Sequence, residues 1–226
     1  MRVGILGGAF NPPHLGHLVC AQEALLQLEL DTVVFVPTGQ PPHRVLEDDP
    51  GGDLRLEMVE LAIAGDSRFA ASRIELDRPG PSYTAETLAA MRSAEPDHEL
   101  FLIVGGDQAA SLPDWHEPEQ VLAQATLVVV ERVSRSRSAI GLQLAPLRGA
   151  DTVLYLETPL IQVSSTMLRR RVACGEPIRY LVPERVVSLI GARGLYASSE
   201  ADGAAPRAAP DAEVAGAATG GPEAAA

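Results

Sequence analysis

The sequence has 226 residues, of which 46% are hydrophobic, enough for the core of one ordinary domain and too few for a second full one. Its formal net charge of -12 excludes a general nucleic-acid binder, because affinity for a phosphate backbone comes from clustered cations. All 18 cationic side chains are Arg, which excludes a G-x-x-x-x-G-K-[ST] phosphate loop, a Schiff-base lysine and a lysyl-AMP intermediate.

Short apolar runs alternate with helical patterns along the chain. Runs of this kind predict a parallel sheet covered on both faces, a doubly wound α/β fold that binds ligands at the carboxyl ends of its strands. We expect strands at 2–6, 32–36, 73–76, 100–104, 127–130 and 153–156. Helices are expected at 16–28, 54–64, 84–92, 118–123, 138–147, 166–174 and 183–192.

The ends and the cysteines of the chain set its expected location and domain limits. The longest apolar runs are far shorter than the roughly 20 residues of a membrane helix, and the N-terminus lacks the pattern of a secretory signal. Cys20 and Cys174 form neither a disulfide framework nor a metal-ligand spacing. We therefore expect a cytoplasmic protein without membrane partners, with one domain at 1–196 and a low-complexity, disordered tail at 197–226.

The first candidate site follows the first predicted strand. Residues 7–17 read Gly-Gly-Ala-Phe-Asn-Pro-Pro-His-Leu-Gly-His, with glycines that let backbone approach a phosphate and a helix N-terminus just beyond. His14 and His17 are three residues apart, so both can face one anion. Helix capping and zinc ligation are the alternatives, although zinc would need further ligands.

A second candidate phosphate site lies late in the chain. Residues 163–169 read Val-Ser-Ser-Thr-Met-Leu-Arg and open a predicted helix. Hydroxyl residues at a helix start are ordinarily N-caps, and that alternative stays open. Arg169 near the helix start favours an anion site, because a guanidinium can grip phosphate bidentately. The two sites would hold one triphosphate if the fold brings them together.

These motifs resemble the nucleotidyltransferase superfamily with H-x-G-H and S-x-T-x-x-R signatures and, within it, the bacterial nicotinate-nucleotide adenylyltransferases. The resemblance extends to about Tyr196 and includes further markers at 41–44, 81–88, 105–107 and 112–115. It implies a Rossmann-like nucleotidyltransferase fold. It also implies transfer of AMP from ATP to nicotinate mononucleotide, which yields deamido-NAD and pyrophosphate in NAD biosynthesis. A nucleotide sensor without catalysis is the alternative, and a homo-oligomer stays open.

The resemblance also implies roles for individual residues. His14, His17 and Arg169 would be catalytic, and Mg²⁺ would be carried by the ATP phosphates with few or no protein ligands. The remaining residues expected around ATP are Gly7, Gly8, Phe10, Asp107, Ser165 and Thr166.

On the acceptor side, the pyridine ring would lie against Trp115, and its carboxylate would be read by backbone N–H groups around Thr84 and His116. Trp115 is equally consistent with a packing residue. The other residues expected there are His43, Arg44 and Tyr83. Arg44 and His116 depart from the residues that are frequent in the family at these positions, Lys and Tyr.

Overall fold

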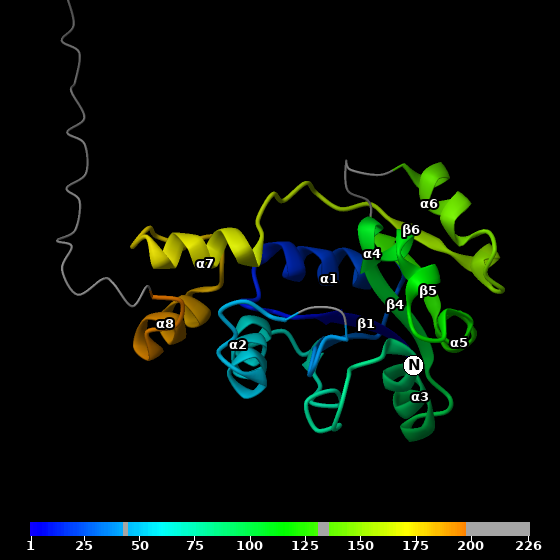
Figure 1. Cartoon of the computed structure of the whole chain (residues 1–226), viewed down its shortest axis with the longest axis horizontal. Coiled ribbons are helices and arrows are strands. Elements are labelled where there is room, and N and C mark those ends of the chain that lie inside the picture. Colours follow the sequence, from blue (N-terminus) through cyan, green and yellow to red (C-terminus); the bar gives the residue numbers. More distant parts are fainter. Residues whose placement is uncertain (43–44, 131–135, 198–226) are drawn as a thin grey trace, which may run out of the picture.

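A six-stranded parallel sheet in the order β3-β2-β1-β4-β5-β6 organises the chain in the computed structural model, which describes residues 1–42, 45–130 and 136–197 (Figure 1). The order of the strands reverses between the central strands β1 and β4: β2 and β3 are added on one side of β1, and β5 and β6 are added on the far side of β4. In open α/β sheets this switch point is where ligands bind. The strands are β1 (Arg2–Gly8), β2 (Thr32–Pro37), β3 (Phe69–Ala71), β4 (Glu99–Gly105), β5 (Thr126–Val130) and β6 (Leu154–Leu156).

Helices cover both faces of the sheet. In β4, Leu100 and Leu102 pack into a buried cluster with α3 to α6, whereas Phe101 and Ile103 pack into a second cluster with α1 and α2. This alternation follows from the pleat of a strand that is buried on both faces. The helices are α1 (Leu15–Gln27), α2 (Gly52–Ile63), α3 (Thr84–Ala94), α4 (Gly106–Ala110), α5 (Pro118–Gln124), α6 (Arg137–Leu144), α7 (Ser165–Ala173) and α8 (Glu184–Arg193), with 3₁₀ turns at Leu112–Asp114 and Ala150–Thr152.

A third buried cluster fixes the C-terminal helices. Met58 of α2, Leu168 of α7 and Val186 of α8 belong to this cluster. In Figure 1, α7 and α8 lie beside α2 at one end of the molecule. This packing brings the start of α7 close to the loop that follows β1, as the contacts below show.

The doubly wound parallel fold is confirmed, and one strand was predicted wrongly. The third strand is Phe69–Ala71, which pairs with Val33–Phe35, and not residues 73–76. Those residues form a turn in which the Asp77 N–H donates to the Arg73 carbonyl at 3.0 Å. Their apolar alternation reflects burial of side chains such as Ile74, which packs against the core from the turn.

Within the described ranges, no helix is both long and apolar enough to cross a membrane. The predicted tail at 197–226 lies, apart from Ala197, outside the described residues.

Candidate active site

A cleft of about 1000 Å³ opens at the carboxyl ends of β1, β4 and β5. The loops after β1 and β4 line it together with residues 158–166 and Arg169. It therefore occupies the switch point of the sheet. Every residue predicted to contact ATP lines this cleft, namely Gly7, Gly8, Phe10, His14, His17, Asp107, Ser165, Thr166 and Arg169.

The loop after β1 is held in a tight conformation by a buried phenylalanine. Phe10 has a left-handed φ of 49° and is 1% exposed. Its ring packs against Phe35, with centroids 5.7 Å apart, and meets the His17 ring edge-on at 5.0 Å. A non-glycine residue in this region is strained and persists only where the surroundings enforce it. The core contact of Phe10 thus orients both the loop and His17.

The two histidines stack on each other at the start of α1. His14 occupies the N-cap position, and its ring centroid lies 3.8 Å from that of His17. The His14 backbone N–H donates to His17 Nδ1 at 3.1 Å. Because Nδ1 accepts this bond, the proton of the neutral His17 ring is on Nε2, which becomes a donor. Gly16 completes the pair, since a Cβ there would lie 3.1 Å from the Cε1 and Nδ1 atoms of His14.

The late motif is joined directly to the loop after β1. Ser164 is the N-cap of α7, and its Oγ accepts from the Met167 N–H at 3.2 Å. The Ser165 hydroxyl donates to the Pro12 carbonyl at 2.8 Å, and Arg169 Nη1 donates to the Asn11 carbonyl at 3.1 Å. The convergence of the two motifs is therefore confirmed. With its hydroxyl hydrogen used on Pro12, Ser165 retains its backbone N–H as a donor for an anion.

Arg169 is nearly buried and is paired with carboxylates of the segment after β2. Its Nε donates to Asp48 Oδ2 at 3.2 Å, and its Nη2 lies 3.5 Å from Glu47 Oε2. Sequence reasoning gave neither acid a role. They are ordinary charged residues in a loop, and no local pattern indicates a partner on α7.

Two further residues that the sequence analysis missed support the same loop. The Arg55 guanidinium of α2, 1% exposed, donates to the Ala9 carbonyl at 3.0 Å and to Asp49 Oδ1 at 2.9 Å. The Tyr196 hydroxyl donates to Asn11 Oδ1 at 2.7 Å. Burial raises the pKa of Tyr196 above its ordinary range, so the phenol stays protonated and remains a donor.

The predicted acceptor residues divide into two groups. Trp115 and Thr84 line the cleft. Trp115 also packs against the core, and its Nε1 donates to Ser111 Oγ at 3.2 Å. It is therefore both a packing residue and a residue that lines the cleft. Tyr83 and His116 are not among the lining residues and pair with each other, with ring centroids 4.2 Å apart. The predicted residues His43 and Arg44 lie outside the described residues.

A buried polar group beside Thr84 extends the cleft. Ser82 Oγ accepts from the Gly39 and Gln40 N–H groups at 3.1 and 3.2 Å. Gly39 is needed here because a Cβ would lie 2.4 Å from the Glu75 carbonyl oxygen. Thr87 Oγ1 donates to Glu75 Oε1 at 2.9 Å. These side chains line the cleft. Ser82 and Thr87 fall within the 81–88 marker, although the sequence analysis gave them no role, and Glu75 carries no sequence signal that sets it apart from surface polar residues.

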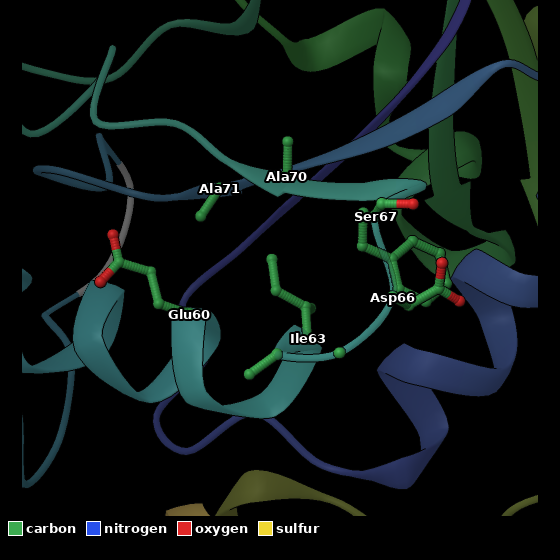
Figure 2. A pocket seen from close by; sticks show the side chains of 9 residues that line it. Glu60, Ile63, Asp66, Ser67, Ala70 and Ala71 are labelled. Atoms are coloured by element: carbon green, nitrogen blue, oxygen red, sulfur yellow. The ribbon is translucent and has the colours of Figure 1, made fainter.

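A second hollow, of about 530 Å³, lies between the end of α2 and the edge strand β3 (Figure 2). It contains no predicted site residue. Of its two carboxylates, Glu60 and Asp66, the second is bound by Arg68, whose hydrogen bonds lower the pKa of Asp66 to about 2. In the part of the chain that the structure describes, no group of three or more His, Cys, Asp or Glu side chains could hold a metal ion.

Comparisons with known proteins identify the family of the chain. Residues 5–171 match the family model described as cytidylyltransferase-like. A relative from Rubrobacter xylanophilus, named as a probable nicotinate-nucleotide adenylyltransferase, is 41% identical over 198 residues, which cover 87% of this chain and 92% of the relative. One of the same name from Thermus thermophilus is 44% identical over 196 residues, covering 87% of this chain and 100% of the relative.

Solved structures share the fold. Nicotinic acid mononucleotide adenylyltransferase of Plasmodium falciparum, complexed with NaAD, superposes with a TM-score of 0.72 at 16% identity over 86% of this chain and 97% of that one. At this identity the likeness shows the fold alone, whereas the relatives above show the family. The chain therefore belongs to the cytidylyltransferase-like family and, within it, to the nicotinate-nucleotide adenylyltransferases.

Proposed function

We propose that the chain transfers AMP from ATP to the 5′-phosphate of nicotinate mononucleotide, which gives deamido-NAD and pyrophosphate in NAD biosynthesis. The observation that carries this proposal is the joining of the two anion-binding motifs around one cleft. Ser165 bonds to Pro12 and Arg169 to Asn11, so the histidine pair and the start of α7 face the same space. Family membership supplies the identity of the substrates.

The chemistry needs positioning and charge stabilisation. A phosphate monoester has a second pKa of about 6, so the acceptor is already largely dianionic at neutral pH. One of its oxygens attacks the α-phosphorus of ATP, the bond from that phosphorus to the bridging oxygen breaks, and pyrophosphate leaves with the electron pair. His17 Nε2–H, His14 and the first N–H groups of α1 would stabilise charge near the α- and β-phosphates.

The far end of the triphosphate would lie against α7. Backbone N–H groups of Ser165 and Thr166 and the guanidinium of Arg169 would hold the β- and γ-phosphates. Asp107, exposed at the start of α4 after β4, would lie near the adenosine ribose. Mg²⁺ would enter as part of the MgATP substrate, since its preferred oxygen ligands are the phosphates and water.

The acceptor would occupy the part of the cleft lined by Thr84 and Trp115. The Trp115 ring offers a flat face for a pyridine, and its Nε1–H is already used on Ser111. Backbone N–H groups near Thr84 and His116 would favour the acid over the amide, because an N–H donor binds a carboxylate more strongly than a neutral carbonyl.

The test is pyrophosphate release with ATP, Mg²⁺ and one of three acceptors: nicotinate mononucleotide, nicotinamide mononucleotide or phosphopantetheine. We expect the highest kcat/KM with nicotinate mononucleotide. Turnover of phosphopantetheine without turnover of pyridine mononucleotides would refute the assignment. ATP binding without product from any acceptor would instead indicate a nucleotide sensor.

His17→Ala should lower kcat about 100- to 1000-fold while the protein stays folded, the usual effect of losing one charge-stabilising donor. His98→Ala is the matched control, because His98 lies outside the cleft and pairs with Glu95 at 3.9 Å. An unimpaired His17→Ala enzyme would remove the central role given to the histidine pair.

A further inference from the structure

Glu47 and Asp48 bind the guanidinium that the proposed chemistry assigns to phosphate. The Arg169 side chain is 10% exposed, whereas the side chains of Glu47 and Asp48 are 81% and 66% exposed. Both acids project from the segment between β2 and α2. The reaction described above uses neither of them.

The backbone of this acidic segment is fixed close to Arg169. Asn11 Nδ2 donates to the Glu47 carbonyl at 2.9 Å, and the neighbouring Asp49 carboxylate is anchored by buried Arg55 at 2.9 Å. The backbone therefore holds the carboxylates of Glu47 and Asp48 near Arg169, while these exposed side chains can rotate into solvent without a backbone movement.

The two acids occupy the side-on edge of Arg169, and Glu47 also lines the cleft. Arg169 Nη1 is turned to the Asn11 carbonyl. Its Nε and Nη2, which form a side-on fork, face Asp48 Oδ2 at 3.2 Å and Glu47 Oε2 at 3.5 Å. Such a fork matches one bidentate anion. A triphosphate that takes it must displace the carboxylates, or bind beside them against like-charge repulsion.

We propose that Glu47 and Asp48 are internal competitors of the triphosphate for Arg169, and that they set the affinity of the enzyme for ATP and for pyrophosphate. This inference rests on the ATP site of the proposed function. The same competition would act after the reaction, when the carboxylates return to the fork and favour release of pyrophosphate. Binding of the mononucleotide, at the Thr84 and Trp115 side of the cleft, would not be affected.

The test is the double variant Glu47→Gln/Asp48→Asn, which keeps shape and removes charge. Ion pairs whose carboxylates are solvent-exposed are individually weak, so we expect the KM for ATP and the inhibition constant of pyrophosphate to fall together by about three- to tenfold. The KM for nicotinate mononucleotide should stay within about twofold of wild type. Glu176→Gln is the control, since Glu176 pairs with Arg171 of α7 at 3.2 Å, and neither lines the cleft.

Unchanged or raised constants for ATP and pyrophosphate in a folded double variant would overturn the inference, and raised constants would mean that the acids position Arg169 instead. Calorimetry of ATP binding without an acceptor separates the two proposals. A tighter Kd for ATP in the double variant supports the competition whichever acceptor the enzyme uses. Lack of turnover with nicotinate mononucleotide refutes only the proposed function, and lack of ATP binding by the wild type overturns both.

Discussion

Replacing Tyr196 with Phe tests whether this residue, which follows α8, supports the loop after β1. The substitution removes a hydroxyl that donates to Asn11 Oδ1 at 2.7 Å, and Asn11 is 2% exposed. A buried acceptor left without its donor costs about 1–3 kcal/mol of folding free energy. For a chain of this size each kcal/mol shifts Tm by about 2–4 °C, so the variant should melt about 2–12 °C below wild type.

Kinetics should separate the support of the loop from general stability. Asn11 also contacts Arg169 and Glu47, so loosening it should raise the KM for ATP more than the KM for nicotinate mononucleotide. Tyr180→Phe is the control, because that side chain is 78% exposed and lies outside the cleft. Equal Tm values for wild type and Tyr196→Phe, or a uniform change in both KM values, would refute the reasoning.

The pH dependence of unfolding gives an independent check. Burial raises the pKa of Tyr196 above its ordinary value of 10.0, so the unfolded chain ionises at a pH where the folded one does not. The stability contributed by this tyrosine is present below pH 10.0 and is lost as pH rises above that value. The chain contains no Lys, which leaves few groups that titrate there. If the free energy of unfolding of the Tyr196→Phe variant fell by a similar amount at alkaline pH, Tyr196 would not be the source of this pH dependence.

Two further substitutions probe the joined motifs. Gly16→Ala places a methyl group 3.1 Å from His14 Cε1, so the ring must shift; we expect kcat to fall at least tenfold with little change in Tm, and wild-type kcat would contradict the packing role of Gly16. Ser165→Ala removes the hydroxyl bonded to Pro12 and keeps the backbone N–H. The variant should lose about 0.5–1.5 kcal/mol of unfolding free energy, measured by urea denaturation, and its KM for ATP should rise severalfold. The cap variant Ser164→Ala is its comparison, with a stability loss of about 1 kcal/mol and a smaller change in that KM.

The sequence predicts most of this fold because the pattern is local. Continuous apolar runs such as 100–104 and 127–130 suit strands buried on both faces, and the helical patterns between them are long enough to be recognised. The third strand was missed because Phe69–Ala71 is a short edge strand, while Ile74 and Leu76 mimic strand alternation from a turn. The spacing of apolar residues alone does not distinguish a short edge strand from such a turn.

The residues that line the cleft were predicted where a motif joins a strand to a helix, and missed where side chains meet only through tertiary structure. Residues 7–17 and 163–169 carry glycines, histidines and hydroxyls at helix starts, which indicate anion binding before any coordinates. Arg55, Tyr196 and the Glu47–Asp48 pair have no such setting. Arg55 in a helical pattern reads as a solvated residue, yet its guanidinium is buried on the carbonyl of Ala9.

The hydrogen bonds that hold the loop after β1 connect residues that are far apart in the sequence and are therefore made at different stages of translation. Pro12 and Ser165 are separated by 153 positions, Asn11 and Arg169 by 158, and Asn11 and Tyr196 by 185. A growing polypeptide therefore carries its histidine pair long before the ribosome has made the residues that hold the loop in place. Prematurely terminated products that end before α7 lack Ser165 and Arg169, and so cannot join the two motifs that line the cleft.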